Sequence, residues 1–299
     1  MQFNELNRDL MININGKILH RSEAGISPFD ASVQAGDAVF EEMRLYNGKV
    51  FRINEHIERL QNSAKALNYD AIPESDYLIN ETRKTIQANG MQNRVKIKLI
   101  LSRGPKHSCG IDPLLNNECT FIIIAEHVIP SAFQEYKLLT SSIRQSTSDS
   151  LDPKIKSINQ LNAVLAKIQA NTTDYNDAIL LDQNGFVVST SSMNLFIVDH
   201  GMLIIPEQVY LAEPISVRTI IDICEENRIG FIHKYISISE VYCVDEVFCS
   251  SIANEIITVT NVDGRKVGRL GNNPLANRIN QLYQNVTSQE GMSMVEYFF

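Results

Sequence analysis

Residues 153–165 read Pro-Lys-Ile-Lys-Ser-Ile-Asn-Gln-Leu-Asn-Ala-Val-Leu and form the most informative stretch of the sequence. They follow a segment rich in Ser and Thr and lead directly into apolar residues. A lysine in such a place can become desolvated, and desolvation lowers the pKa of an amine. A neutral amine is the form that makes a Schiff base with an aldehyde. The pattern alone fits equally a lysine that is solvated at the surface.

Short hairpins and helices are expected before this stretch. Asn15-Gly16 and Asn47-Gly48 each predict a type I′ hairpin turn, because Asn and Gly accept the positive φ angles of that turn. Asn54 is placed to cap a helix, since apolar residues recur after it at spacings of three and four. The expected elements are hairpins at 12–18 and 43–51, helices at 54–67 and 75–89, and strands at 95–101 and 121–125.

A change of composition near residues 126–135 indicates a domain junction. Residues 140–153 are rich in Ser and Thr and lack apolar periodicity, which predicts a mobile or functional loop. The elements expected after it are helices at 159–170, 214–230 and 274–286, hairpins at 178–189, 195–205 and around 261–264, and a strand at 246–250. The sequence thus predicts an α+β fold with two domains, 1–128 and 129–299, each a largely antiparallel sheet with helices packed on it.

Composition narrows the class of protein. The chain has 299 residues, of which 44% are hydrophobic, and this is enough apolar material to build a sizeable core. A formal net charge of −8 argues against nucleic acid or an anionic membrane surface as a partner. No apolar run approaches the roughly 18 residues of a membrane-spanning helix, and the N-terminus does not resemble a signal peptide. Five irregularly spaced cysteines without a C-x-x-C pair give no support to a metal site. We expect a soluble, cytoplasmic protein.

Several motifs together suggest a family. Lys156-Ser-Ile-Asn-Gln-Leu resembles the cofactor-lysine segment of the class IV aminotransferases, the fold-type IV pyridoxal-phosphate enzymes. Residues 36–41 (Gly-Asp-Ala-Val-Phe-Glu), 51–60, 194–196 and 245–256 also resemble motifs of that family, in its order and spacing. The resemblance covers roughly residues 12–268. The family includes branched-chain and D-amino-acid aminotransferases and aminodeoxychorismate lyase. The motif sequences are most similar to those of the D-amino-acid enzymes.

The resemblance implies a cofactor, pyridoxal 5′-phosphate, and residues that bind it. Lys156 would be the catalytic lysine, which links to the cofactor and moves the proton at the substrate α-carbon. Arg59 would hold the phosphate, since a guanidinium matches phosphate oxygens. The backbone N–H groups of Ser216 and Val217 would bind the same phosphate at a helix N-terminus. The family also implies a homodimer, in which a neighbour's loop completes each site.

Three departures from the family pattern affect the cofactor pocket. Ser189 stands where the family has a glutamate beside the pyridine nitrogen. A carboxylate keeps that nitrogen protonated, whereas a serine hydroxyl does not. The family's Gly-Ile-Thr corresponds to residues 215–217, and its Gly-Thr corresponds to Ser251 and Ile252, so two hydroxyls near the phosphate are missing. These changes predict weaker phosphate binding.

Candidate substrate contacts are Phe40 and Arg44, and Lys106 and His107, which follow Arg103-Gly104 where D-amino-acid enzymes carry a carboxylate trap. A flexible basic loop is the alternative interpretation of the second pair. The expected partner is a small amino-acid-like molecule, and the expected reaction is amino-group transfer from an amino acid to a 2-oxo acid. Two alternatives stay open: a lyase of the aminodeoxychorismate lyase type, and a degenerate family member without catalysis.

Overall fold

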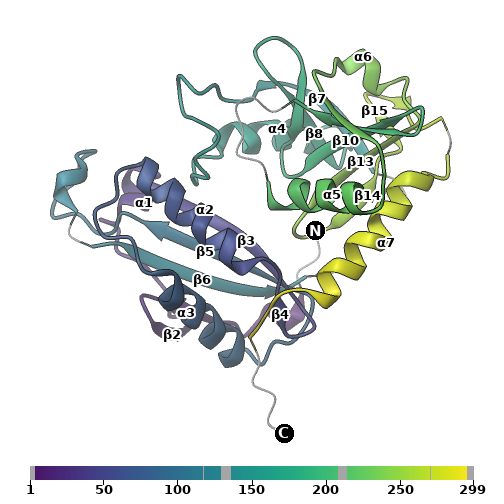
Figure 1. The fold of residues 1–299 in the computed structure, drawn as a ribbon. Helices are drawn as coiled ribbons and strands as arrows, with labels where there is room; N and C mark the ends of the chain where they lie inside the picture. Colours follow the sequence, from purple (N-terminus) through teal and green to yellow (C-terminus); the bar gives the residue numbers. More distant parts are fainter. Residues whose placement is uncertain (1–3, 117, 129–135, 208–213, 270, 295–299) are drawn as a thin grey trace, which may run out of the picture. The chain divides into compact units, whose positions relative to one another are not determined.

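The computed structural model describes residues 4–116, 118–128, 136–207, 214–269 and 271–294, and these divide into two compact units (Figure 1). Unit 1 comprises Met1–Ile129, Ile155–Asn159 and Thr287–Phe299, and unit 2 comprises Pro130–Lys154 and Gln160–Val286. This division differs from the predicted 1–128 and 129–299 at two places. Residues 155–159 join unit 1, where Ser157 forms a bridge with Val39, and β17 (Met292–Ser293) joins it by pairing with β4 (Lys49–Val50).

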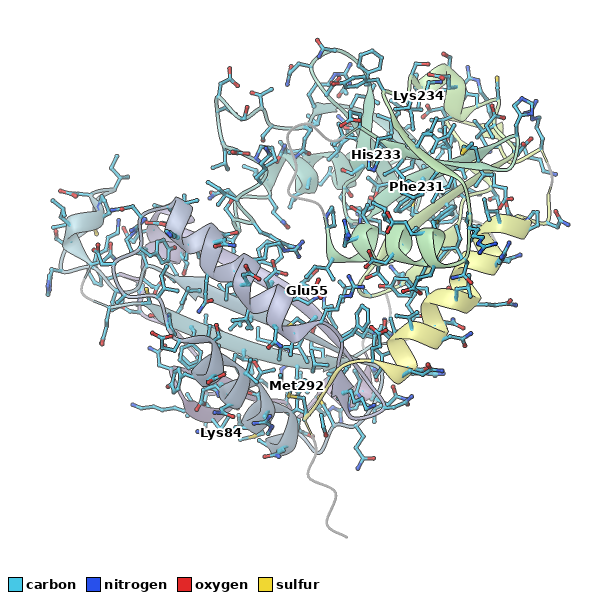
Figure 2. The ribbon with its side chains drawn as sticks, viewed as in Figure 1. Glu55, Lys84, Phe231, His233, Lys234 and Met292 are labelled. Carbon is cyan, nitrogen blue, oxygen red and sulfur yellow. The ribbon has the colours of Figure 1, made fainter. Side chains whose placement is uncertain are left out.

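Unit 1 is built on one antiparallel sheet with the strand order β17-β4-β3-β5-β6-β1-β2. Its strands are β1 (Met11–Ile14), β2 (Lys17–His20), β3 (Ala38–Tyr46), β4 (Lys49–Val50), β5 (Val95–Ser102), β6 (Thr120–His127) and β17 (Met292–Ser293). Met292 of the edge strand β17, labelled in Figure 2, is in register with Val50. Both Asn-Gly turns form as predicted, with positive φ at Asn15 (50°) and Asn47 (47°).

Two long helices cover one face of this sheet. They are α2 (Ile53–Ala66) and α3 (Ser75–Ala88); the short helices of unit 1 are η1 (Glu5–Asn7), α1 (Ala31–Ala35) and η2 (Pro113–Leu115). Ile57 and Leu60 of α2 are fully buried against alternate residues of β3 and β5. The predicted cap at Asn54 was wrong. Arg52, with a left-handed φ of 48°, is the N-cap, so Asn54 lies inside the first turn.

Unit 2 contains two five-stranded sheets, ordered β12-β11-β10-β13-β14 and β16-β15-β7-β8-β9. The strands are β7 (Lys137–Arg144), β8 (Asp177–Leu181), β9 (Val187–Thr190), β10 (Asn194–Asp199), β11 (Met202–Pro206), β12 (Phe231–Lys234), β13 (Glu246–Ser251), β14 (Glu255–Thr258), β15 (Asn261–Val262) and β16 (Arg265–Lys266). One apolar core contains residues from both sheets. The expectation of one sheet in this domain was wrong, because unit 2 has two. The sheets are largely antiparallel, as predicted, with parallel pairs at β11–β12, β7–β8 and β15–β7.

Helices cover the outer faces of these sheets. They are α4 (Leu161–Asn171), α5 (Ile215–Glu226) and α7 (Pro274–Gln289), whereas the short α6 (Ile238–Val241) buries Val241 in the core that both sheets share. α5 and α7 share a core with β10 and β13, in which the rings of Phe196 and Phe248 stack at 4.9 Å. α4 packs on the other sheet through Ala166 and Ala170. None of the helices in the described ranges is long and apolar enough to cross a membrane.

The loop predicted at 140–153 was wrong over its first five residues, which belong to β7. Ser141 is buried in that strand, and its hydroxyl donates to Oε1 of Gln169 (2.8 Å). Thr140 donates from both N and Oγ1 to the carboxylate of Asp263 (2.6 and 2.5 Å). Hydroxyl groups thus occupy strand positions where the sequence pattern anticipates apolar residues.

Candidate active site

Lys156 is held against the start of β3. Its carbonyl accepts a hydrogen bond from the N–H of Phe40 (2.9 Å), and the N–H of Ile158 donates to the carbonyl of Ala38 (3.0 Å). The N–H of Lys156 also donates to Oγ of Ser63 on α2 (3.3 Å). The backbone of this lysine is therefore anchored to a strand and a helix of unit 1, which fixes where its side chain starts.

The amine of Lys156 lies in a desolvated environment beside an aromatic ring. Its Nζ is 5.2 Å from the ring centroid of Phe40, and Nζ of Lys98 is 4.6 Å from the same centroid. Burial lowers the pKa of Lys156, and the charge of Glu41 opposes this change only in part. Lys154, by contrast, is exposed. Of the two lysines in the opening stretch, Lys156 has the environment that favours a neutral, reactive amine.

A fully buried carboxylate, Glu41, lies on the α2 side of β3. Its Oε2 accepts from Nδ1 of His56 (2.8 Å), and Arg59 donates from Nε to Oε1 (2.6 Å) and from Nη2 to Oε2 (2.7 Å). His56 and Arg59 are three residues apart on α2 and so share one face of the helix. Burial by itself would raise the pKa of Glu41, but His56, Lys156 and Arg59 outweigh it and bring the pKa to about 2.

His56 is the third member of this cluster, and its burial favours the neutral ring. Burial lowers its pKa below the ordinary value of 6.5. Because an ionised carboxylate only accepts hydrogen bonds, we assign the proton of the neutral ring to Nδ1, which faces Glu41. Glu41 and His56 lie within the sequence motifs at 36–41 and 51–60, but the sequence predicted no role for either residue. The available signal was a charged residue among apolar residues at alternate positions of the strand, since Val39, Met43 and Leu45 are apolar.

A second polar cluster lies in unit 2, at the N-terminus of α5. Asn194 on β10 donates from Nδ2 to Oγ of Ser216 (3.0 Å) and to the carbonyl of Ser250 on β13 (3.4 Å). Ser250 is 1% exposed, and its hydroxyl has no hydrogen-bond partner within the part of the chain that the structure describes. Asn194 and Ser250 are opposite one another in register, so their side chains share one face of the sheet. Val217 is buried in the same first turn of α5.

This cluster fits an anion. A helix N-terminus presents backbone N–H groups and the positive end of the helix dipole. The unsatisfied hydroxyl of Ser250 is a further donor whose partner an anionic oxygen would supply. Ser251 and Ile252 are half-buried at the end of β13, where the hydroxyl of Ser251 accepts from the N–H of Asn254 (3.1 Å). Sequence reasoning pointed to Ser216 and Val217 but missed Ser250, which no local pattern distinguishes.

Ser189 lies on β9 and is half-buried, and its hydroxyl donates to the carbonyl of Thr190 (3.0 Å). The turn that follows is tied to Asp177 on β8, which is fully buried. The carboxylate of Asp177 accepts from the hydroxyls of Thr190 (2.7 Å), Ser192 (2.6 Å) and Ser191. The chain after Ser189 is therefore held by the Asp177 carboxylate, although Ser189 itself stands where the family has a glutamate.

The remaining sequence candidates separate into two places in unit 1. Phe40 and Arg44 occupy alternate positions of β3, and the guanidinium of Arg44 is 5.3 Å from the ring centroid of Tyr46. Lys106 is buried and donates from Nζ to the carbonyl of Gly110 (2.6 Å), whereas His107 is exposed. Lys106 therefore closes its own loop in this structure, and of these candidates Phe40 is the one whose ring lies beside the amine of Lys156.

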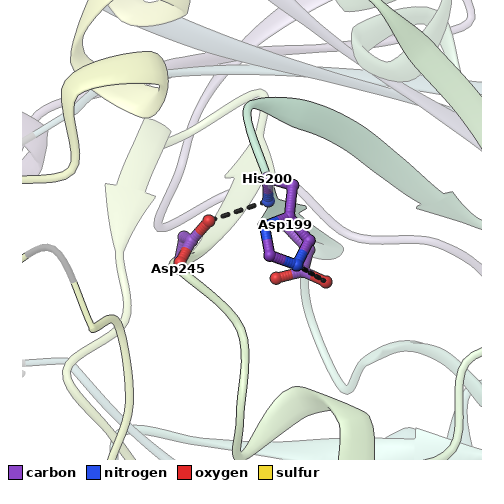
Figure 3. A group of neighbouring side chains, drawn as sticks. All are labelled: Asp199, His200 and Asp245. Carbon is purple, nitrogen blue, oxygen red and sulfur yellow. Dashed lines mark hydrogen bonds and ion pairs between the residues drawn. The ribbon is translucent and has the colours of Figure 1, made fainter.

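Figure 3 shows a cluster of Asp199, His200 and Asp245 whose side chains could in principle hold a metal ion. Nη2 of Arg269 lies 3.0 Å from Oδ1 of both aspartates. The backbone N–H of His200 donates to Oδ2 of Asp245 (2.8 Å), while its side chain is largely exposed. Arg269 pairs with both carboxylates, so this cluster is explained as an ion-pair network at the turn between β10 and β11.

Comparison with known proteins gives consistent results. The family model for amino-transferase class IV matches residues 38–262. The chain is 34% identical to the branched-chain-amino-acid aminotransferase-like protein 2 of Arabidopsis thaliana, covering 97% of this chain but only 53% of that relative. It is 32% identical to a putative branched-chain-amino-acid aminotransferase of Methanocaldococcus jannaschii, over 96% of this chain and 100% of the relative.

Solved structures are similar as well. The branched-chain amino acid aminotransferase from Escherichia coli has a TM-score of 0.86 at 27% identity, covering 98% of this chain and 97% of that chain. The chain thus spans about half the length of the Arabidopsis relative but nearly all of the Escherichia coli structure. The motifs were most similar to those of the D-amino-acid enzymes, but the overall identity is not higher for them. The D-alanine aminotransferase of Bacillus licheniformis is 27% identical to this chain, compared with 34% and 32% for the two relatives above.

Proposed function

The chain belongs to the class IV aminotransferase family and has its fold-type IV architecture, and on that premise we propose that it is a pyridoxal-5′-phosphate-dependent enzyme that transfers an amino group from an amino acid to a 2-oxo acid. The observation that carries the proposal is the environment of Lys156. Its backbone is anchored, its amine is desolvated, and a buried acid–base cluster lies beside it.

Each residue has a separate task in this mechanism. Pyridoxal phosphate, when bound, supplies an aldehyde and an electron-withdrawing ring. Lys156 would hold that group through Nζ and would accept and return the proton at the substrate α-carbon, a task for which its lowered pKa is an advantage. The first-turn N–H groups of Ser216 and Val217 and the hydroxyl of Ser250 would bind the phosphate, and the family pattern gives Arg59 a phosphate-binding role.

The test is reductive labelling. Borohydride treatment after incubation with pyridoxal phosphate should attach the pyridoxyl group to Lys156 and abolish exchange by dialysis. Lys156→Ala should lose the label, and Lys154→Ala is the matched control because that side chain is exposed two residues away. A label on Lys154, or no label on the wild-type protein, would contradict the proposal.

Ser189 favours a second candidate function. If a hydroxyl contacts the pyridine nitrogen, the ring is largely unprotonated at neutral pH and carbanion formation is slower. Every 1.4 kcal/mol of lost stabilisation lowers the rate about tenfold, so transamination should be weak. A lyase reaction, which depends less on ring protonation, is the alternative, and a non-catalytic binding role is the next.

Single-turnover kinetics separate these candidates. With an amino acid as the amino-group donor, which leaves as its 2-oxo acid, Ser189→Glu should convert bound cofactor to pyridoxamine phosphate at least about tenfold faster than wild type if ring protonation limits the reaction. Ser191→Ala, which also changes a hydroxyl of this segment, serves as the control and should give no acceleration. Normal cofactor binding without faster turnover in Ser189→Glu would favour the lyase or the binding role.

We further propose a homodimer in the cytoplasm. Four large apolar residues of α4 are at least 44% exposed and recur at helical spacing, namely Leu161, Val164, Leu165 and Ile168. Such an apolar stripe supports contact with a second copy, and two-fold dimers are the commonest oligomers. All five cysteines are unpaired, as in a reducing compartment. Light scattering should give twice the chain mass, and Leu161→Glu combined with Ile168→Glu should give monomers.

A further inference from the structure

Glu41 is the buried group for which the proposed mechanism has no use. It is completely inaccessible to solvent at an inward position of β3, where its neighbours Val39 and Met43 belong to the apolar core. An isolated carboxylate in such a place is strongly unfavourable, so it requires compensating partners. Its partners are all residues at or beside the proposed cofactor site. That coincidence suggests that the carboxylate serves the site rather than the core.

Four charged groups act electrostatically on the amine of Lys156. Glu41 and Glu42 of β3 are the nearby carboxylates, Arg59 of α2 and Lys98 of β5 are the nearby cations, and His56 is neutral. Arg59 engages both oxygens of Glu41, so these two charges largely compensate one another. Whether the amine of Lys156 carries a proton is then decided by burial and by the balance between this carboxylate and this guanidinium.

We propose that Glu41 is a positioning residue of the Lys156 site, which fixes the guanidinium of Arg59 and the ring of His56 and supplies the buried negative charge that offsets the cations around the reactive amine. The proposal rests on the proposed function only in one respect, namely that Lys156 is the reactive lysine. Glu41 itself touches neither the reacting amine nor an anion. It acts by holding Arg59 in place and by the electrostatic effect of its charge on the amine of Lys156.

The experiment measures the proton affinity of one amine in the protein without added cofactor. Trace acylation with acetic anhydride from pH 6 to 11, followed by peptide mass spectrometry, gives the apparent pKa of Lys156. Glu41→Gln keeps the shape and removes the charge, so the apparent pKa should fall by about one unit or more. Arg59→Gln removes the opposing charge and should raise it. A merely structural role would not produce shifts of opposite sign.

Glu42→Gln is the matched control. Glu42 is the next residue of β3, is half-buried and pairs with Lys96 at 3.5 Å, so its removal should shift the pKa of Lys156 by much less. The double variant Glu41→Gln, Arg59→Gln should return the value toward that of wild type. Equal shifts in Glu41→Gln and Glu42→Gln, or no shift in either Glu41→Gln or Arg59→Gln, would overturn the proposal.

Two further outcomes keep this inference separate from the proposed function. Should Glu41→Gln fail to fold, Arg59→Gln alone decides, because an unchanged apparent pKa in that variant contradicts the role of the pair. Should pyridoxal phosphate fail to label Lys156 of the wild-type protein while the opposite shifts are observed, the enzyme assignment fails and the role of Glu41 stands. If Lys156 is labelled but the pKa shifts are not observed, the enzyme assignment stands and the role of Glu41 fails.

Discussion

Asn194 and Ser250 are opposite one another on adjacent strands, yet the side-chain amide of Asn194 donates to Ser216 and to the Ser250 carbonyl and leaves the Ser250 hydroxyl unsatisfied. Burying a hydroxyl without a partner is unfavourable, typically by about 1–3 kcal/mol. The folded protein therefore carries a cost at this position that a bound anion would remove.

Ser250→Ala should accordingly separate stability from anion binding. We expect the free energy of unfolding to stay constant or rise by up to about 1 kcal/mol, because no hydrogen bond is lost. The affinity for inorganic phosphate or pyridoxal phosphate should fall severalfold at the same time. Urea unfolding and a spectroscopic titration measure the two quantities.

Ser141→Ala provides the comparison for that prediction. Ser141 is 2% exposed, but its hydroxyl donates to Gln169 and accepts from the N–H of Ile143 (2.9 Å). Its removal should therefore destabilise unit 2 by about 1–3 kcal/mol without changing anion affinity. Equal destabilisation by the two substitutions would show that the Ser250 hydroxyl has a partner after all.

Acid should weaken the protein through Glu41. Its pKa is about 2 in the folded chain, below the ordinary 4.5, so the folded state binds fewer protons than the unfolded state between these values. The stabilisation is present in full above pH 5 and is lost as the pH falls toward 2, to a total of about 3 kcal/mol. His56, whose pKa is also lowered, acts in the same direction from pH 6.5 downward. Urea unfolding at pH 7 and pH 3 should show a smaller loss in Glu41→Gln than in Glu42→Gln.

Asp177→Asn should loosen the turn that follows Ser189. Three hydroxyls and the N–H of Ala178 (2.8 Å) converge on this buried carboxylate, and an amide replaces one acceptor oxygen by a donor. Hydrogen bonds to charged groups contribute about 1.5–3 kcal/mol, so a loss of about 3 kcal/mol is expected in chemical unfolding. Asp174→Asn, at an exposed position with a φ of 59°, should change stability by less than about 0.5 kcal/mol.

Gly104→Ala tests a close backbone approach next to the Lys106 loop. A Cβ at this position would lie 1.7 Å from the carbonyl oxygen of Glu118, and the φ of 101° disfavours any other residue. We expect a loss of about 3 kcal/mol or more in thermal or urea unfolding. Gly25→Ala, which would meet no atom within 4 Å, should leave stability nearly unchanged.

The sequence was informative wherever the determinant was local. Asn15-Gly16 specifies its hairpin through backbone preferences of two residues, and the apolar spacing of Ile57 and Leu60 specifies a buried helix face. The cap predicted at Asn54 was wrong because Arg52, which follows β4 in a left-handed conformation, is the N-cap. The helix therefore starts two residues earlier than the capping preference of Asn54 indicates. The strand at Thr140–Arg144 was missed because its polar side chains are satisfied by distant partners.

In the candidate site, too, only the features that depend on a local motif could be predicted from the sequence. Lys156 could be assigned because a contiguous motif surrounds it. Glu41, His56 and Arg59 come together only after β3 and α2 have packed, and no local pattern says that a guanidinium will take both oxygens of one carboxylate. The unsatisfied Ser250 hydroxyl is a property of three segments that are distant in sequence.

The order of the chain through its two units has a consequence for synthesis on the ribosome. β17 pairs with β4, the N–H of Met294 donates to the carbonyl of Gly48 (2.8 Å), and the Met294 side chain is buried in the core of unit 1. Lys156 likewise pairs with β3 after more than a hundred intervening residues. Unit 1 cannot complete its sheet while only its first 129 residues have emerged, so the edge strand β17 is added only when nearly the whole chain has been made. A nascent protein arrested midway would expose the edge of β4 and the unfilled place of Met294, where a chaperone could bind.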